Sequence, residues 1–173
     1  CPTPIHLGKP LPGRELRLSA SGEVQVRGGI LATGILNPSG QLESITDAAG
    51  WASTGDVGTF NENNELILIG RRDRMIISGG ENIHPENIEA ILSDVPSVTR
   101  VAVVGIFHPH YGMRPAAFVA GVLDVDYLRG FLAERVERFA IPDCFFPWPD
   151  SIPINDAKID YMELTHLAAS MAH

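Results

Sequence analysis

Residues 70–92 constrain the fold more than any other part of the chain. Their sequence, GRRDRMIISGGENIHPENIEAIL, places an arginine cluster directly before a short apolar run, MIIS, at 75–78. The double glycine Gly79-Gly80 then predicts a tight turn, because glycine adopts positive φ without a steric penalty. A helix is expected to start at Pro85, whose missing N–H has no partner to lose in the first helical turn. The run therefore predicts a junction where one structural unit ends and another begins.

The residues before this junction predict antiparallel β structure. Apolar and polar residues nearly alternate in GRELRLS (13–19) and in GEVQVRGG (22–29), with Ser21-Gly22 as a turn between them. Such alternation is typical of half-buried strands joined in a hairpin. ELILIG (65–70) is a further strand candidate. We therefore expect residues 1–70 to form a β-rich segment.

The residues after the junction predict a small domain with a short sheet and about three helices over residues 71–173. VTRVAVVGIF (98–107) and AAFVAGVL (116–123) are typical of strands, and CFF (144–146) is a third candidate. A last helix is expected near 160–170. A further helix is predicted by an apolar stripe at helical spacing, which consists of Leu128, Phe131, Leu132, Val136 and Phe139. The predicted fold class of the chain is therefore α+β.

The composition excludes several classes of protein. A chain of 173 residues that is 45% hydrophobic and 20% charged is expected to fold around a packed core. Its formal net charge of −8 argues against nucleic acid as a partner. No apolar run approaches the roughly 20 residues that span a membrane. Cys1 and Cys144 have no metal-like spacing, so we expect no metal site, and two cysteines suit the reducing cytoplasm.

Thr54-Gly55-Asp56 forms the first candidate site. A short carboxylate held in a glycine-containing turn can accept hydrogen bonds from two vicinal hydroxyls, as a ribose offers. Such charge-assisted bonds are worth roughly 1.5–3 kcal/mol each. An aspartate in a turn is, by itself, more often an ordinary turn residue. The context favours the binding role, because Trp51 precedes the triplet and Gly70-Arg71 follows it.

These residues resemble the W-x-x-T-G-D and G-R motifs of the adenylate-forming enzymes, which comprise acyl-CoA and aryl-CoA synthetases, nonribosomal-peptide adenylation domains and firefly-type luciferases. HLGKPLPG (6–13) and GEVQVRGGILATGILN (22–37) are similar to two structural segments of the same family. The resemblance covers nearly the whole chain, but only the last third of a typical member. It implies that Asp56 holds the ribose of ATP and of the adenylate, and that Arg71 also contacts the nucleotide.

The resemblance implies that the 70–92 run joins the large domain to a mobile small domain. SGGENI (78–83) is similar to the segment of CoA ligases that lies along the pantetheine arm, which implies that CoA approaches Gly79 and Gly80 closely. The hinge is implied at Asp73 and Arg74. The family commonly has aspartate or lysine at the pivot, and here arginine follows aspartate, so both residues stay candidates.

Lys158 is the candidate catalytic residue. It lies in PINDAKIDYMEL (153–164), which resembles the last motif of the family, P-x-x-x-x-G-K. The resemblance implies that its ammonium bridges the attacking carboxylate and the α-phosphate, where charge develops. The chain departs from the motif with Ala157 in place of glycine, and with Asp160-Tyr161 where a basic residue is frequent. Considered alone, this lysine would be an ordinary surface residue.

The resemblance implies an AMP-forming ligase that joins a small carboxylic acid to CoA with ATP and Mg²⁺, whose ligands lie outside this chain. SGGENIHPENIE (78–89) and YGMRPAAFVA (111–120) resemble the o-succinylbenzoate-CoA ligases of menaquinone synthesis. A fatty or aromatic acid-CoA ligase, a nonribosomal-peptide adenylation domain and a luciferase-like oxygenase stay open. The family's phosphate loop, adenine-binding strand and acyl pocket are missing. We therefore expect the N-terminal domain of the same enzyme as a partner, and no activity from the chain by itself.

Overall fold

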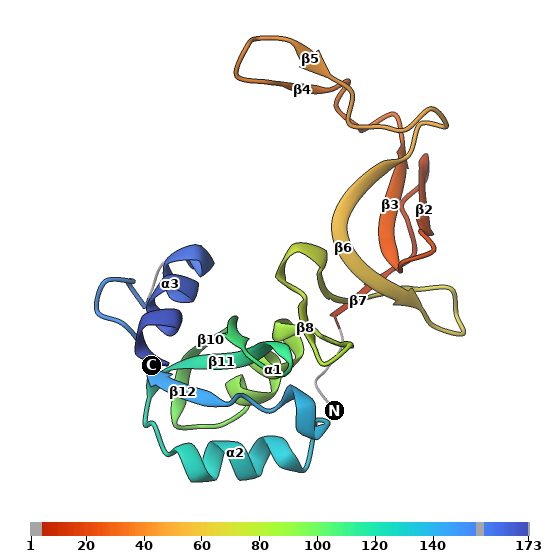
Figure 1. The fold of residues 1–173 in the computed structure, drawn as a ribbon. Helices are drawn as coiled ribbons and strands as arrows, with labels where there is room; N and C mark the ends of the chain where they lie inside the picture. The colour runs from red at the N-terminus through yellow and green to blue at the C-terminus, as the bar shows by residue number, and fades with distance from the viewer. Residues whose placement is uncertain (1–4, 155–157, 173) are drawn as a thin grey trace. The chain divides into compact units, whose positions relative to one another are not determined.

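The computed structural model describes residues 5–154 and 158–172. The chain separates into two compact units between Asp73 and Arg74. As Figure 1 shows, the first unit is built of strands and the second combines strands with helices. This confirms the predicted fold class, α+β, with an antiparallel β segment followed by a small α+β domain.

The first unit contains a five-stranded antiparallel sheet in the order β1-β7-β6-β3-β2. Its strands are β1 (Ile5–Gly8), β2 (Arg14–Leu18), β3 (Glu23–Gly28), β6 (Ala52–Phe60) and β7 (Leu66–Arg71). The alternation in the sequence predicted the β2–β3 hairpin correctly, because Arg14 lies opposite Gly28 and Leu18 opposite Val24. Two short strands, β4 (Ile35–Leu36) and β5 (Leu42–Glu43), pair with each other and extend beyond this sheet (Figure 1).

Trp51, in the segment that leads into β6, packs against two arginines of the β2–β3 hairpin. The guanidinium carbons of Arg17 and Arg27 lie 4.3 and 4.6 Å from the centroid of the Trp51 ring, and the tryptophan is buried. A cation above an aromatic face is attracted by the ring quadrupole, by about 0.5–1 kcal/mol at a partly exposed site. These contacts hold the start of β6, and therefore the residues that follow it, against its neighbour β3.

The second unit is organised around a long antiparallel hairpin. Its strands are β8 (Ile76–Ser78), β9 (Glu81–Ile83), β10 (Val98–His108), β11 (Gly112–Gly121) and β12 (Cys144–Pro147). The sheet order is β10-β11-β8-β9, and β12 pairs with β11 in parallel. The strands predicted at 75–78, 98–107, 116–123 and 144–146 are confirmed within a few residues. No helix among the described residues is long and apolar enough to cross a lipid bilayer.

The β10–β11 hairpin separates two apolar cores. Successive side chains of a strand point to opposite faces, so a run that is apolar at every position is expected to be covered on both sides. Val101 and Val103 of β10 join the core under α1 (Pro85–Ser93) and α2 (Val125–Ala133). Ala102 and Val104 join the core under α3 (Tyr161–Met171). The three helices therefore cover the two faces of one sheet (Figure 1).

The helix starts follow from their capping residues. Pro85 stands at the start of α1, as its sequence predicted. Asp124 caps α2 by accepting a hydrogen bond of 3.0 Å from the Tyr127 N–H. Asp160 caps α3 in the same way, at 3.0 Å from the Glu163 N–H. The aspartate that departs from the family's last motif thus has a structural reason, because it starts the final helix.

The apolar stripe from Leu128 to Phe139 is only partly helical. Helix α2 ends at Ala133, and a short 3₁₀ turn, η2 (Arg138–Ala140), follows after an extended residue at Glu137. Val136 and Phe139 nevertheless pack against the same core as Leu128. Helical spacing predicted which residues face the core, but it does not distinguish one long helix from a shorter helix followed by a turn that packs on the same face.

Replacement of Phe118 by alanine is expected to lower the free energy of unfolding by about 3–5 kcal/mol, because its side chain is fully buried in the α3-side core and leaves a cavity. Phe107 in the facing strand is 76% exposed and supplies the matched control, for which Phe107→Ala is expected to change stability by about 0.5 kcal/mol or less. Urea unfolding followed by circular dichroism measures both. Similar losses in the two variants would contradict the assignment of the core.

Candidate functional site

Asp56 and Arg71 are opposite each other on neighbouring strands. The structure places Thr54-Gly55-Asp56 within β6, where the sequence had led us to expect a turn, and Asp56 pairs in register with Arg71 at the end of β7. The pairing with β3 shifts register between Glu23 and Gln25, so the strand is irregular beside the triplet. Gly55 has φ of +77°, which gives this part of the strand the local geometry of a turn. The prediction of a turn is therefore wrong, because the triplet lies in a strand. The positive φ of Gly55 nevertheless explains why glycine stands at this position.

Gly55 makes room for the guanidinium of Arg71. A Cβ atom on Gly55 would lie 2.9 Å from Nη2 of Arg71, closer than a side chain tolerates. Arg71 Nη1 donates to the Thr54 carbonyl oxygen at 3.1 Å and to Asp56 Oδ1 at 3.2 Å. The T-G-D and G-R segments therefore depend on each other. Gly55 has no side chain, and the Arg71 guanidinium occupies the space that a side chain there would fill.

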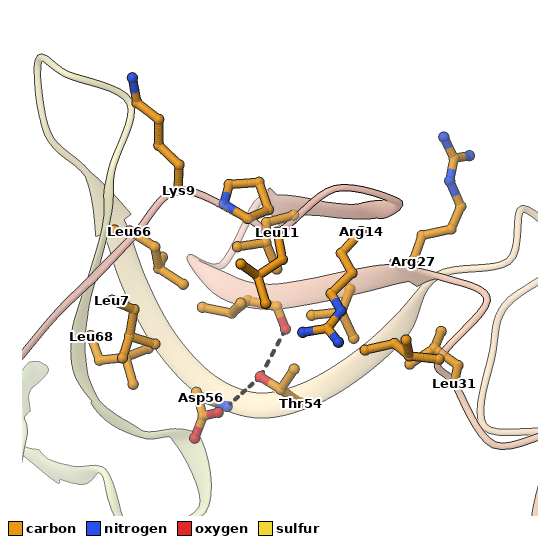
Figure 2. A pocket seen from close by; sticks show the side chains of 16 residues that line it. Leu7, Lys9, Leu11, Arg14, Arg27, Leu31, Thr54, Asp56, Leu66 and Leu68 are labelled. Atoms are coloured by element: carbon orange, nitrogen blue, oxygen red, sulfur yellow. Dashed lines mark hydrogen bonds between the residues drawn. The ribbon is translucent and has the colours of Figure 1, made fainter.

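Further hydrogen bonds fix the backbone around Asp56. Thr54 Oγ1 donates to the Val24 carbonyl oxygen at 3.0 Å and accepts from the Asp56 N–H at 3.1 Å, as the dashed lines in Figure 2 show. The Asp56 carboxylate itself stays about one-third exposed. Among the described residues, Arg71 is the side chain that donates to it, which leaves acceptor capacity for a ligand. Hydrogen bonds from Arg71 to Asp73 and to Asp56 raise the pKa of Arg71, so its positive charge is permanent.

An apolar hollow of about 350 Å³ lies beside Asp56 on the sheet of the first unit (Figure 2). Leucine and valine side chains from β1, β2, β3 and β7 form much of its apolar part, and the polar residues Lys9, Arg14, Arg27, Thr54 and Asp56 also line it. Several apolar side chains around the hollow are more than half exposed, namely Leu7, Leu11 and Ile30. This surface of the sheet is therefore only partly covered within the unit.

Glu23 supports the same strand from the other side and was missed as a site residue. Its side chain is buried, accepts from the Gly55 N–H at 3.2 Å and pairs with Arg72 Nη1 at 2.8 Å. The sequence placed Glu23 in a structural segment of the β2–β3 hairpin. A charged residue between apolar neighbours at the start of a strand was the one signal available for its role.

The side chains of consecutive arginines at the junction are fixed in different units. Arg72 pairs with Glu23 and Arg71 pairs with Asp73, all within the first unit. Arg74 is instead the first residue of this part of the second unit and pairs within it, with Nη2 2.6 Å from Glu89 Oε1. The two predicted hinge residues, Asp73 and Arg74, are therefore adjacent in sequence, but Asp73 pairs within the first unit and Arg74 pairs within the second.

The side chains that contact Arg74 are largely buried. Besides Glu89 it pairs with Glu86 at 3.0 Å, and its guanidinium carbon lies 3.7 Å from the centroid of the Tyr161 ring. Glu89 also accepts from the Val103 N–H at 2.7 Å, so the pair is bonded to β10. Burial raises the pKa of Tyr161 to about 12, which keeps its phenol neutral at physiological pH. These contacts tie Arg74 to α1, β10 and α3.

The Gly79-Gly80 turn connects β8 and β9. Both glycines have positive φ, +60° and +93°, which confirms the tight turn predicted from the sequence. A Cβ on Gly80 would meet no atom within 4 Å, so this glycine faces open space. Gly79 is closer to its surroundings, because a Cβ there would lie 3.4 Å from Tyr111 Cδ1 and its N–H donates to the Tyr111 carbonyl oxygen at 2.8 Å.

Lys158 is exposed and precedes α3, on the side of the sheet opposite to α1 and α2. Ala157 and the two residues before it lie outside the described residues, so the middle of the last motif has no structural account. The structure brings Asp56 and Arg71 together, and it places Gly79, Gly80 and Lys158 in the second unit at different positions. No group of three His, Cys, Asp or Glu side chains able to hold a metal ion occurs within the described parts of the chain.

Comparisons with known proteins show which family the chain resembles. The family described as the AMP-binding enzyme C-terminal domain matches residues 87–156. A 2-succinylbenzoate–CoA ligase of Haemophilus influenzae is 38% identical over 148 residues, which cover 83% of this chain and 32% of that ligase.

Solved structures show the same relationship. MenE of Escherichia coli, with a bound analogue of OSB-AMS, has a TM-score of 0.78 and 30% identity, covering 94% of this chain and 35% of that one. The o-succinylbenzoate CoA synthetase (MenE) of Bacillus subtilis, in complex with the acyl-adenylate intermediate OSB-AMP, has a TM-score of 0.81 and 28% identity over 92% of this chain and 35% of that one. The chain thus spans about a third of the length of the relatives it matches.

Gly55→Ala is expected to destabilise the chain by about 1–2 kcal/mol through its positive φ, and further through displacement of Arg71. Gly22→Ala is the matched control, since Gly22 has φ of +79° and a Cβ there would make only ordinary contacts, with Val57 Cγ1 at 3.7 Å and the Gly58 carbonyl oxygen at 3.9 Å. The additional loss at Gly55 should be up to about 1 kcal/mol, because the Arg71 contacts are partly exposed. Urea unfolding measures the difference, and equal losses would show that the glycine is not needed to accommodate Arg71.

Proposed function

Because the chain belongs to the adenylate-forming superfamily, of which it matches a C-terminal portion, we propose that it is part of an ATP-dependent carboxylate–CoA ligase. In the first half-reaction a carboxylate attacks the α-phosphate of Mg-ATP and releases pyrophosphate, which gives an acyl-adenylate. In the second, the thiol of CoA attacks the acyl carbon and AMP leaves. The observation that carries the proposal is the Asp56–Arg71 pair, which the two motifs build across neighbouring strands.

The proposed roles are those that the family resemblance implies, and the pairing of Asp56 with Arg71 supports the first two. Asp56 accepts hydrogen bonds from the ribose hydroxyls of ATP and of the adenylate, and Arg71 orients this carboxylate and adds positive charge toward the nucleotide. Lys158 supplies an ammonium to the attacking carboxylate and the α-phosphate during adenylation. Gly79 and Gly80 leave room for the thiol-bearing arm of CoA, since glycine permits close approach of backbone to a ligand.

We further propose that residues 1–70 end a large domain, and that residues 71–173 form a small domain that rotates between the half-reactions. The anchoring at the junction supports this proposal. Arg72 is held by Glu23 within the first unit and Arg74 by Glu89 within the second, so a rotation of the backbone between these two anchors would leave both ion pairs intact. Hinges are typically a few such residues that absorb a change in φ and ψ.

The proposed partner is the preceding domain of the same enzyme. The partly uncovered hollow on the sheet of the first unit supports it, because apolar surface of this kind is more stable when another surface removes it from water. Within the described residues no acidic cluster offers a metal site, so the ligands of the Mg²⁺ that accompanies ATP are proposed to lie in that domain. The proposed acid is 2-succinylbenzoate, after the names of the relatives.

Lys158→Ala in the full-length ligase is expected to lower 2-succinylbenzoate-dependent ATP–pyrophosphate exchange by roughly 10²- to 10³-fold, because one charge that stabilises the transition state is removed. Attack of CoA on supplied acyl-adenylate should be spared. Residues 1–173 alone are expected to catalyse neither half-reaction.

The control for this experiment is Met162→Ala, at a residue 73% exposed near the start of α3. It should leave both half-reactions unchanged. An equal fall of the two half-reactions in Lys158→Ala would contradict the adenylation role. No exchange in the unmodified enzyme with 2-succinylbenzoate, but exchange with benzoate or a fatty acid, would contradict the proposed acid and retain the proposed ligase class.

Gly80→Phe is expected to show the opposite pattern. The added ring would occupy the open space at the turn and should slow CoA-dependent release of AMP from supplied adenylate by about 10-fold or more, with pyrophosphate exchange retained. Gly80→Asn is the control, since asparagine tolerates positive φ better than other residues and adds less bulk. Normal thioester formation in Gly80→Phe would contradict the proposed approach of the thiol.

A further inference from the structure

We propose that Arg114 is a positioning residue that holds the Gly79-Gly80 turn in the shape that the thioester-forming step requires. This inference rests on the proposed function, in which the turn borders the path of the thiol. Arg114 lies in β11, within the YGMRPAAFVA segment that resembles the o-succinylbenzoate-CoA ligases, but no role followed for it from that resemblance. Only 11% of its side chain is exposed, although arginine is normally a surface residue.

Every N–H donor of the Arg114 guanidinium has a partner. Asp143 accepts from Nε at 2.9 Å and from Nη2 at 2.7 Å, in a bidentate pair. The second Nη2 donor reaches the Ile141 carbonyl oxygen at 3.1 Å. Nη1 donates to the Phe139 carbonyl oxygen and to Ser78 Oγ at 3.3 Å. An arginine has five N–H donors in a rigid fork, so this side chain is saturated and its orientation is determined by its surroundings.

These partners connect the turn to a different part of the unit. Ser78 is the last residue of β8 and directly precedes Gly79, and it is buried. The other partners belong to the segment 139–143, which begins within η2 and leads into β12. The guanidinium therefore bridges the base of the turn and a segment distant in sequence. Arg114 stands on β11 between Gly112, which pairs with Ser78 of β8, and Ala116, which pairs with Cys144 of β12.

Ile76 of β8 and Ile83 of β9 anchor the hairpin in the core under α1 and α2, but the turn itself has little other support. β8 pairs with β11 through a single register pair, Ser78 opposite Gly112, and Gly79 adds one backbone hydrogen bond to Tyr111. β8 and β9 are three residues each. A two-stranded hairpin this short is not stable by itself. Since backbone pairing is so limited, the side-chain bond from Arg114 to Ser78 is a substantial part of what determines where the turn lies.

Arg114 also shapes the space beside the turn. A hollow of about 680 Å³ is bordered by Ser78 and Gly79 on one side and by Phe139 and Asp143 on another, and Arg114 contributes to its wall. The bonds of Arg114 join these borders to each other. Loss of the guanidinium would release the turn and the 139–143 segment together, and misplacement of a positioning element by about 1 Å can slow a reaction by about 10²-fold.

The test compares the half-reactions of the full-length ligase carrying Arg114→Lys. Lysine keeps the charge but has three donors on a flexible stem, so it cannot reproduce the bonds to Ser78, Asp143 and both carbonyl groups. CoA-dependent release of AMP from supplied adenylate, measured at saturating CoA, is expected to fall about 10- to 100-fold. ATP–pyrophosphate exchange is expected to change less than about 2-fold. Ser78→Ala removes one of the bonds and should give a smaller loss in the thiol step alone.

Phe118→Leu is the matched control for lost stability, because Phe118 lies in the same strand and does not contact the turn. Its urea midpoint indicates how much a destabilised β11 lowers either half-reaction. Equal falls of both half-reactions in Arg114→Lys, or an unchanged thiol step, would overturn the positioning role. If the unmodified enzyme shows no CoA-dependent step at all, the proposed function fails instead, and the two failures are thereby distinguished.

Discussion

The ion pair between Arg74 and Glu89 determines where the second unit begins. Both side chains are mostly buried, and the pair is bonded to β10 through the N–H and the carbonyl oxygen of Val103. A buried ion pair contributes little net stability, because desolvation of the two charges offsets their attraction, but removal of one partner leaves an uncompensated charge. The pair therefore acts mainly on geometry, since it keeps the residue after Asp73 with the helices of the small domain.

The same principle operates at the two other arginine sites. Arg71 fills the space that Gly55 leaves, and Arg114 fills the space between β8 and the segment before β12. Each guanidinium is bonded to backbone carbonyl oxygens as well as to a carboxylate. A planar group with five donors can connect strands that share few backbone hydrogen bonds. Irregular regions beside the proposed sites are thus held by side chains where ladder pairing is interrupted.

Local patterns predicted much of the fold correctly. The β2–β3 hairpin, the β8–β9 turn and the start of α1 each followed from period-2 alternation, paired glycines or a proline at the first helical position. Two predictions failed for a common reason. The T-G-D triplet is in a strand, and the apolar stripe after Leu128 leaves its helix at Ala133. In both cases the spacing of residues is compatible with more than one backbone path, and packing against distant segments selects one of them.

The sequence by itself determined the fold class, because the alternation and spacing of apolar residues are local patterns. The candidate residues Asp56, Arg71, Gly79, Gly80 and Lys158 also came from the sequence, through the resemblance of its motifs to those of a known family. Only the tertiary structure places the Arg71 guanidinium in the space beside Gly55. Only the tertiary structure pairs Arg72 with Glu23 in the first unit and Arg74 with Glu89 in the second. Tertiary structure also decided that Arg114, separated from Ser78 by 36 positions, bonds to the base of the turn. Such pairings depend on strand order and register, which no local pattern encodes.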